Sequence, residues 1–170
     1  MCGIVGYIGQ RQATEICLAG LKRLEYRGYD SAGIAVVRDG KLEVVKVVGK
    51  LAALAAELEE TPLDGTVGVG HTRWATHGKP SKTNSHPHVS NDGRIALVHN
   101  GIIENYAELR DQLRAEGFNF ASETDTEVIV HLVAKYYDGD LAAAFRRAAE
   151  DLEGAFAVGI VCADDPDRMV

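Results

Sequence analysis

The strongest constraint on the fold is a pair of β-branched runs at residues 32–37 and 42–48, which flank Arg38-Asp39-Gly40. An Asp-Gly step between two such runs is typical of a tight β-hairpin. A hairpin joins antiparallel neighbours directly, whereas parallel strands need a long crossover between them. The segment therefore argues against strict βαβ alternation and predicts largely antiparallel sheets.

The rest of the chain mixes helices and strands in an irregular order. Apolar residues recur at helical spacing over residues 13–24 and again over 51–58. Further helices are predicted after Asn105, after Thr124 and after Asp140, and the first two have a glutamate at capping-box spacing. We expect one mixed α/β (α+β) domain of layered helices and sheets, without a linker. The remaining strands are predicted at residues 2–8, 66–72, 95–99 (closed by Asn100-Gly101) and 155–163.

Charge and cysteine content narrow the class of protein. The net charge of −7 argues against a nucleic-acid or anionic-membrane surface, because both need a basic patch. No apolar run approaches the length of a membrane span, and the N-terminus lacks the basic region of a signal peptide. Three cysteines without framework spacing suit a reducing compartment, so we expect a cytoplasmic protein.

Cys2 directly follows Met1. Methionine aminopeptidases act where residue 2 is small, so we expect the mature chain to begin with Cys2. A terminal cysteine carries a strong nucleophile beside its own α-amine, whose ordinary pKa of about 7.7–8.0 suits a general base. A small apolar residue that opens a buried strand fits the position equally well.

Three other positions have both a structural and a functional interpretation. Asn100-Gly101 is either a tight turn or an oxyanion hole made from a side-chain amide and a backbone N–H. Arg73, beside Trp74, opens a long polar segment at 73–93, where it forms either a surface ion pair or a carboxylate clamp. Asp125 either stabilises a helix dipole or accepts an ammonium group.

Five of the six histidines fall between residues 71 and 99, so a zinc site has to be considered. No cysteine joins them and the spacing lacks paired ligands, so solvated or hydrogen-bonding histidines are the better interpretation, and no metal is expected. Residues 26–31 form an aromatic connector. It contains either an internal Arg27–Asp30 pair or a brace beneath the N-terminal residue, and we favour the brace.

Five motifs in a fixed order carry a family resemblance. They are CGIVG at 2–6, EYRGYDSAG at 25–33, HTRWATHG at 71–78, HNGIIEN at 99–105 and SETDTE at 122–127. Together they resemble the glutaminase domain of the glutamine–fructose-6-phosphate aminotransferases, a branch of the N-terminal-nucleophile glutamine amidotransferases. The resemblance covers essentially the whole chain, and it implies a four-layer α/β/β/α sandwich.

The resemblance also implies a role for each matched residue. Cys2 would attack glutamine and form a γ-glutamyl thioester, with its α-amine as base and with Asn100 and Gly101 as the oxyanion hole. Arg73 would hold the α-carboxylate of glutamine and Asp125 its α-ammonium. No cofactor is implied. Thr76 and His77 would line the pocket, Trp74 would gate ammonia, His86 would belong to a mobile loop, and Arg27 would give support.

In the family, further strands and two sugar-isomerase domains follow this region. We therefore expect residues 1–170 to be an incomplete sandwich within a longer, homo-oligomeric protein. The ammonia would convert fructose 6-phosphate to glucosamine 6-phosphate through those domains. Two alternatives stay open: an amidotransferase half that serves another acceptor such as phosphoribosyl pyrophosphate, and a non-catalytic amino-acid-binding module.

Overall fold

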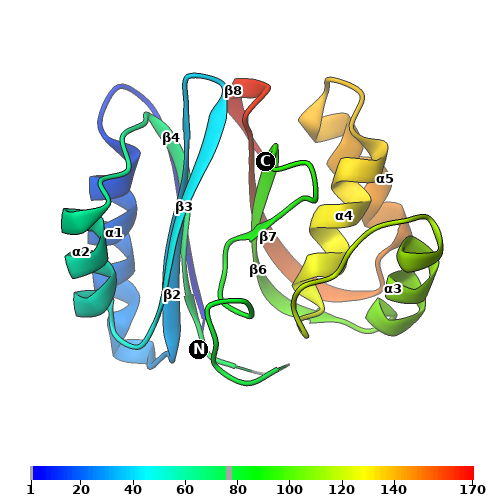
Figure 1. Ribbon diagram of the computed structural model, residues 1–170, viewed down its shortest axis with the longest axis horizontal. Helices are drawn as coiled ribbons and strands as arrows, with labels where there is room; N and C mark the ends of the chain where they lie inside the picture. Colours follow the sequence, from blue (N-terminus) through cyan, green and yellow to red (C-terminus); the bar gives the residue numbers. More distant parts are fainter. Residues whose placement is uncertain (1, 76–77) are drawn as a thin grey trace.

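A computed structural model describes residues 2–75 and 78–170, apart from the Arg27 side chain. Two four-stranded sheets face each other, and helices cover the outer face of each (Figure 1). The first sheet has the order β1-β4-β2-β3, and α1 and α2 pack on it. The elements of this half are β1 (Gly3–Ile8), α1 (Ala13–Leu24), a 3₁₀ turn (Glu25–Arg27), β2 (Ser31–Arg38), β3 (Lys41–Val48), α2 (Leu51–Glu60) and β4 (Val67–Arg73).

The second sheet has the order β5-β6-β7-β8, and every pairing in both sheets is antiparallel. The helices α3, α4 and α5 cover its outer face (Figure 1). No helix among the described residues is long and apolar enough to cross a membrane. The elements of this half are β5 (His88–Val89), β6 (Ile95–Ile103), α3 (Tyr106–Ala115), α4 (Thr126–Tyr136), α5 (Leu141–Asp151), β7 (Gly154–Cys162) and β8 (Asp165–Met169).

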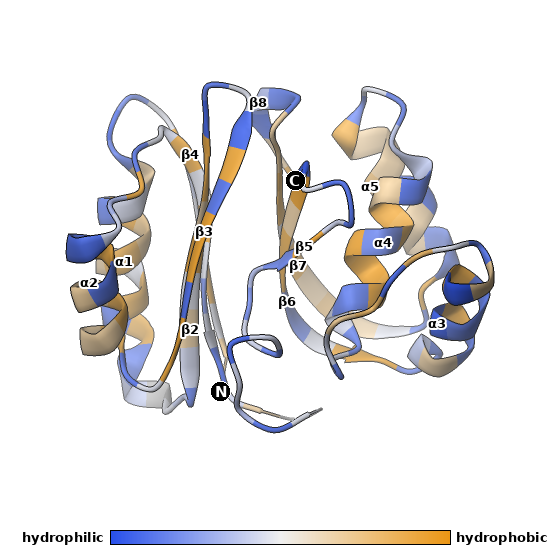
Figure 2. Cartoon of the chain, viewed as in Figure 1, coloured by the Kyte–Doolittle hydropathy of each residue, from blue (hydrophilic) through white to orange (hydrophobic). Residues whose placement is uncertain are grey.

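Three buried apolar clusters separate four layers, which confirms the α/β/β/α sandwich. In β2, Ile34 and Val36 pack toward the helices, whereas Ala35 and Val37 join the cluster between the sheets. Successive side chains of a strand point to opposite faces, so a strand covered on both faces reads as a continuous apolar run. Figure 2 shows hydrophobic residues in the strands of both sheets and along α4.

The predicted hairpin is confirmed: Ser31 pairs with Val48 at one end and Arg38 with Lys41 at the other. Its two loop residues, Asp39 (φ 48°) and Gly40 (φ 70°), both have the positive φ that a type I′ turn requires. Helix α1 also begins and ends where the sequence pattern predicts.

The prediction that Asn100-Gly101 closes a strand is wrong. Strand β6 continues through this pair to Ile103, because β7 pairs with it along its whole length. Gly101 has φ 134°, and a Cβ at this position would lie 2.3 Å from the carbonyl oxygen of Ala155. The glycine is therefore required by the close approach of a neighbouring strand, and the tight-turn interpretation is excluded.

Neither predicted capping box forms. The Asn105 side chain donates to the carbonyl oxygen of Asp151 and accepts from the Glu153 N–H, so it ties the start of α3 to the α5–β7 connection. Glu127 accepts from the Ser122 N–H and hydroxyl and does not cap α4. The predicted cap of α5 is confirmed, since the Asp140 carboxylate accepts from two backbone N–H groups of that helix.

Strands β1, β5 and β8 also differ from the sequence prediction, and β5 (His88–Val89) lies in the segment predicted as a loop. Strand β1 lies at the edge of its sheet, and Ile8 is 44% exposed, so the strand is only half-buried. Strand β8 was not predicted, because the sequence DPDRM reads as a turn although it pairs with β7.

Residues 84–90 of the long polar segment are mostly buried and pack between the sheets, and we call this stretch the interior segment. A Cβ on Gly33 would lie 2.2 Å from the carbonyl oxygen of His86, so the segment crosses the inner face of β2 at van der Waals distance. Lys46 on β3 donates to the carbonyl oxygen of Ser85 at 3.0 Å. Burial lowers the pKa of Lys46 to about 8. The interior segment thus lies beside the site described next, whereas residues 79–80, 82–83 and 91–93 are exposed.

Candidate active site

The backbone of Trp74 holds the Cys2 thiol. Antiparallel pairing places Gly3 opposite Thr72, so Cys2 lies beside the residues that follow β4. The Trp74 N–H donates to Cys2 Sγ at 3.2 Å, and Sγ lies 3.6 Å from the Trp74 carbonyl oxygen. The half-buried sulfur is therefore held just before the first residue of β1.

The Asn100 amide faces Cys2 from the opposite sheet. Asn100 Nδ2 donates to the Cys2 carbonyl oxygen at 3.4 Å, across the space between β6 and β1. Gly101 follows on the same strand and is exposed. The structure thus brings together the cysteine and the amide that the sequence places 98 residues apart.

Arg73 is a buried cation, only 4% exposed. Its Nη2 donates to the Gly78 carbonyl oxygen at 3.1 Å, and its Nη1 lies 4.0 Å from Asp30 Oδ1. A buried guanidinium requires an anionic or carbonyl partner. The surface ion pair that sequence alone allowed is therefore excluded.

Asp125 is also buried, and its Oδ2 accepts from the Ile103 N–H at 3.0 Å. It stands at the start of α4 without capping that helix. The loop at residues 78–84 connects Asp125 indirectly to Arg73. Asn84 packs closely against Gly78, whose carbonyl oxygen accepts from Arg73. The Asn84 side chain also donates to the Glu123 carboxylate and accepts from the Glu123 N–H. The two charged groups of the predicted clamp therefore border the same loop.

A group of buried histidines lies directly behind Asn100. His71 Nε2 is 2.8 Å from Asn100 Oδ1, and His71 Nδ1 is 3.0 Å from His86 Nδ1. Thr126 Oγ1 lies 2.9 Å from both His86 Nε2 and His99 Nδ1. Burial lowers the pKa of His71 to about 4 and holds that of His86 well below its ordinary range.

These histidines are hydrogen-bonded and buried, so the solvated interpretation is wrong for them. Among residues 2–75 and 78–170, no group of three or more His, Cys, Asp and Glu side chains is arranged to hold a metal ion. His86, with both ring nitrogens bonded in the interior, is better suited to support than to gating.

The aromatic connector at residues 26–31 is hydrogen-bonded to Arg73 and Ala75, which flank Trp74. Asp30 Oδ2 accepts from the Ala75 N–H at 2.5 Å, and the Asp30 N–H donates to the Arg73 carbonyl oxygen at 2.8 Å. The Tyr29 hydroxyl accepts from the N–H of Leu51 and donates to Glu25. The connector thus contacts the residues on either side of Trp74, and a brace beneath Cys2 stays a prediction; the Arg27–Asp30 pair depends on a side chain outside the described part.

The remaining predicted positions fall into two groups. The Trp74 side chain is 54% exposed, and its ring lies 3.1 Å from where a Cβ on Gly28 would be. Thr76 and His77 lie outside the described residues. Sequence reasoning missed Asp30, His71 and Thr126 as site residues, although His71 stands two positions before Arg73 at the same strand end.

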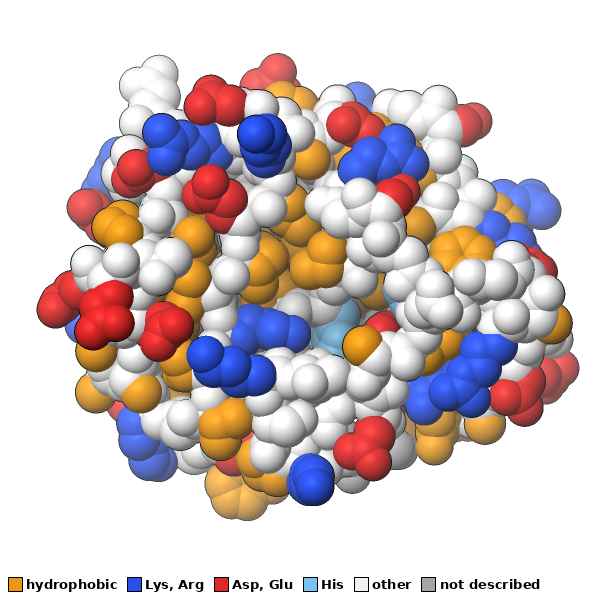
Figure 3. All heavy atoms as spheres, viewed as in Figure 1, with side chains coloured by type: hydrophobic (Ala, Val, Ile, Leu, Met, Phe, Trp, Pro, Cys, Tyr) orange, Lys and Arg blue, Asp and Glu red, His pale blue; other side chains and the backbone are white. Residues whose placement is uncertain are grey.

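Figure 3 shows the face of the molecule that Figure 1 views. The surface is hollowed between the two sheets, and hydrophobic, basic and histidine side chains lie inside the hollow.

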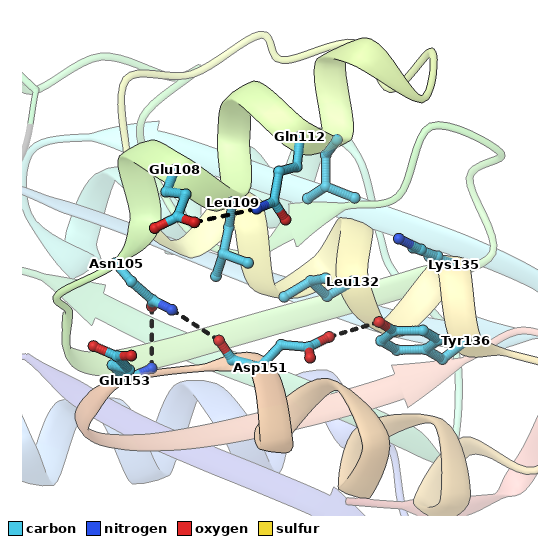
Figure 4. Close-up of a pocket in the computed structure, with 10 residues that line it drawn as sticks. Asn105, Glu108, Leu109, Gln112, Leu132, Lys135, Tyr136, Asp151 and Glu153 are labelled. Carbon is cyan, nitrogen blue, oxygen red and sulfur yellow. Dashed lines mark hydrogen bonds between the residues drawn. The ribbon is translucent and has the colours of Figure 1, made fainter.

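A cavity of about 290 Å³ lies on the outer side of the second sheet, between α3 and α4 (Figure 4). Some of its polar side chains bond to one another, as in the contact of 2.6 Å from the Tyr136 hydroxyl to Asp151 Oδ2. None of the site residues lines this cavity, so it is separate from Cys2.

Comparison with known proteins gives a consistent result. Residues 36–169 match the family described as "Glutamine amidotransferase domain". The chain is 57% identical over 170 residues to a glutamine–fructose-6-phosphate aminotransferase (isomerizing) of Caldanaerobacter subterraneus, and 57% identical to one of Clostridium perfringens. Each alignment covers all of this chain and 28% of the relative, so the chain spans less than a third of these relatives' length.

Two solved structures share the fold. A glutamine phosphoribosylpyrophosphate amidotransferase from B. subtilis superposes with a TM-score of 0.81 at 30% identity, covering 96% of this chain and 35% of the other. A structure described as the allosteric regulatory enzyme of purine biosynthesis gives 0.84 at 31% identity, covering 96% and 36%.

The buried histidines predict that stability falls as the pH drops below about 6.5. Burial lowers the pKa of His88 to about 3 and that of His71 to about 4. A histidine in the unfolded chain titrates at about 6.5, so above that pH neither state takes up these protons. Below it the unfolded chain binds protons that the folded chain does not, and the free energy of unfolding decreases.

Denaturant unfolding at steps between about pH 7 and 5 measures this slope before most carboxylates titrate. His88→Gln removes one titrating group, and it should give a shallower slope whatever it does to stability at pH 7. Equal slopes for the two proteins would contradict the prediction.

Proposed function

This chain belongs to the glutamine amidotransferase domain family, and we propose that it hydrolyses L-glutamine to glutamate and ammonia through a thioester on Cys2. The observation that carries the proposal is the convergence of a nucleophile and an amide donor. Cys2 Sγ is held by the Trp74 N–H, and Asn100 Nδ2 reaches the backbone of the same cysteine.

The chemistry needs only groups of the chain, a bridging water molecule and one water molecule that is consumed. The Cys2 sulfur attacks the γ-carboxamide carbon, and its proton passes through a bridging water to the α-amine that removal of Met1 exposes. The tetrahedral intermediate collapses as the C–N bond breaks, and the protonated amine supplies the proton with which ammonia leaves. Water then hydrolyses the thioester, which releases glutamate and restores the thiol.

Asn100 and Gly101 are proposed to stabilise the negative oxygen of that intermediate. A donor that is already oriented toward developing charge needs no reorganisation during the reaction. The Asn100 amide is held on both sides, by His71 and by the Cys2 carbonyl oxygen. This support of the amide is what an oxyanion hole requires.

Arg73 and Asp125 are proposed to recognise the amino-acid end of glutamine. Both side chains are buried, with relative exposures of 4% and 5%. A buried guanidinium suits the α-carboxylate and a buried carboxylate suits the α-ammonium, since each charge is neutralised by its opposite. Thr76 and His77 complete the pocket in this proposal.

The acceptor of ammonia is proposed to lie in the rest of a longer, homo-oligomeric protein that also carries sugar-isomerase domains. The relatives that are 57% identical are named for fructose 6-phosphate, whereas the phosphoribosylpyrophosphate amidotransferase is 30% identical. The comparison favours fructose 6-phosphate, with glucosamine 6-phosphate as product. Trp74, which is 54% exposed and whose backbone N–H contacts the thiol, is the proposed gate for ammonia.

Cys2→Ala should abolish ammonia release while glutamine binding stays measurable, because only the nucleophile is lost. A glutamate dehydrogenase-coupled assay and calorimetric titration with glutamine measure the two quantities. A form that retains Met1 should also be inactive, because its base becomes an amide. Turnover by either form at the wild-type rate would overturn the proposed function. Loss of binding as well as turnover in Cys2→Ala would leave the nucleophile unproved and require Cys2→Ser.

The site also predicts a separation of chemistry from recognition. Asn100→Ala should lower kcat by about 10²–10³ with little change in KM, as the loss of one oxyanion donor does elsewhere. Arg73→Gln and Asp125→Asn should mainly raise KM, because each leaves one charge of glutamine unpaired. Steady-state kinetics of the three variants checks this pattern, and equal small effects at all three positions would contradict it.

A further inference from the structure

We propose that His71 is a positioning residue for Asn100: a one-way hydrogen-bond chain through three buried histidines holds the Asn100 amide with its NH₂ group toward Cys2. The inference rests on the proposed function, in which that NH₂ group binds the oxyanion. The chain runs from His99 through Thr126 and His86 to His71. It ends on Asn100, the residue next to its starting point.

The first link is determined by an obligatory acceptor. His71 Nε2 lies 3.0 Å from the carbonyl oxygen of His99, which can only accept, so Nε2 must carry the proton. The same Nε2 lies 2.8 Å from the Asn100 side chain, so the amide atom on that side must be the oxygen. The Cys2 carbonyl oxygen independently requires a donor on the other side, at 3.4 Å. Both contacts give the same amide orientation.

The remaining links follow in order. A neutral His71 with its proton on Nε2 has a bare Nδ1, so His86 must donate from Nδ1 across 3.0 Å. His86 Nε2 is then an acceptor and takes the Thr126 hydroxyl proton at 2.9 Å. Because Thr126 has only that proton, it accepts from His99 Nδ1–H at 2.9 Å. Every bond of the chain therefore points toward Asn100.

The chain requires neutral imidazoles, and their surroundings provide that condition. His71, His86 and His99 are at most 5% exposed, and no carboxylate is among their hydrogen-bond partners described above. A second proton on His71 would place two N–H groups against each other at the contact with His86. Hydrogen bonds in a row polarise one another in a low-dielectric interior. The side-chain carbonyl of Asn100 is thus polarised, and the NH₂ group of the same amide becomes a better donor.

The chain also binds the amide to four separate elements. His71 belongs to β4 of the first sheet, and His99 and Asn100 belong to β6 of the second. His86 comes from the interior segment, and Thr126 opens α4. Without the His71 bond the amide could rotate and turn its oxygen toward the developing negative charge, which would oppose the reaction.

Nuclear magnetic resonance of the resting protein tests the chain without any reference to activity. Long-range ¹H–¹⁵N correlation spectra distinguish the two neutral tautomers of each histidine. At about pH 7 we expect the proton on Nε2 of His71, on Nδ1 of His86 and on Nδ1 of His99. A proton on Nδ1 of His71, or a charged His71, would overturn the inference.

Kinetics tests whether the chain acts through Asn100. His71→Leu should lower kcat about 10-fold to 100-fold and leave KM within about twofold, because a misplaced donor weakens only the transition state. His71→Gln keeps an N–H near the position of Nε2 and should recover most of the loss. In the Asn100→Ala background, His71→Leu should have no further effect on kcat.

The matched control is His131→Leu. It removes a fully buried imidazole that contacts Phe118 and Phe120 and takes no part in the hydrogen-bond chain. It should lower stability but leave kcat unchanged. An unchanged kcat in His71→Leu, or an equal loss in the Asn100→Ala background, would overturn the inference. Failure of the wild-type protein to release ammonia would refute the proposed function instead. The tautomer spectra would still show whether the hydrogen-bond chain has the proposed direction. They also decide it if His71→Leu does not fold.

Discussion

Packing between the two sheets is the constraint on which the rest of the structure depends. Val69 of the first sheet meets Val98 and Val161 of the second in one buried cluster. Close-packed interiors fix separations to within a methyl group, so this layer sets the distance from β4 to β6. The Asn100 amide of β6 can reach the Cys2 carbonyl oxygen, just before β1, only at that distance. The contact between Asn100 and Cys2 is therefore a consequence of core packing and is not an independent feature.

The same layer becomes polar at one end, and this change defines the site. Around Val69 the space between the sheets is filled by aliphatic side chains, whereas around His71 it holds imidazoles, a threonine and a guanidinium. Buried polar groups stabilise a fold only when their hydrogen bonds are made. The histidine chain meets that demand with neutral groups, and it places its last donor behind Asn100. The same hydrogen bonds therefore satisfy the buried polar groups and orient the Asn100 amide.

The sequence predicts features that neighbouring residues determine. The Asp39-Gly40 hairpin, helix α1 and the Asp140 cap are all local, and all three are confirmed. The extent of β6 beyond Asn100 depends on β7, which lies about fifty residues later in the chain. The Asn105 side chain likewise finds its partners on the α5–β7 connection instead of its own helix. Motif order identified Cys2 and Asn100, but the supporting roles of Asp30 and Thr126 arise only from contacts between distant segments.

Cys2 alone of the three cysteines is the proposed nucleophile. Cys17 and Cys162 are buried, and burial raises the pKa of Cys17 to about 12, so it remains an unreactive thiol. The most direct measurement is mass spectrometry of the protein after treatment with a glutamine-analogue electrophile, followed by peptide mapping. We predict one adduct, on a Cys2 that has become the N-terminal residue, and slower labelling when glutamine is present. Labelling of Cys17 or Cys162 at a comparable rate, or a Cys2 that glutamine does not protect, would contradict it.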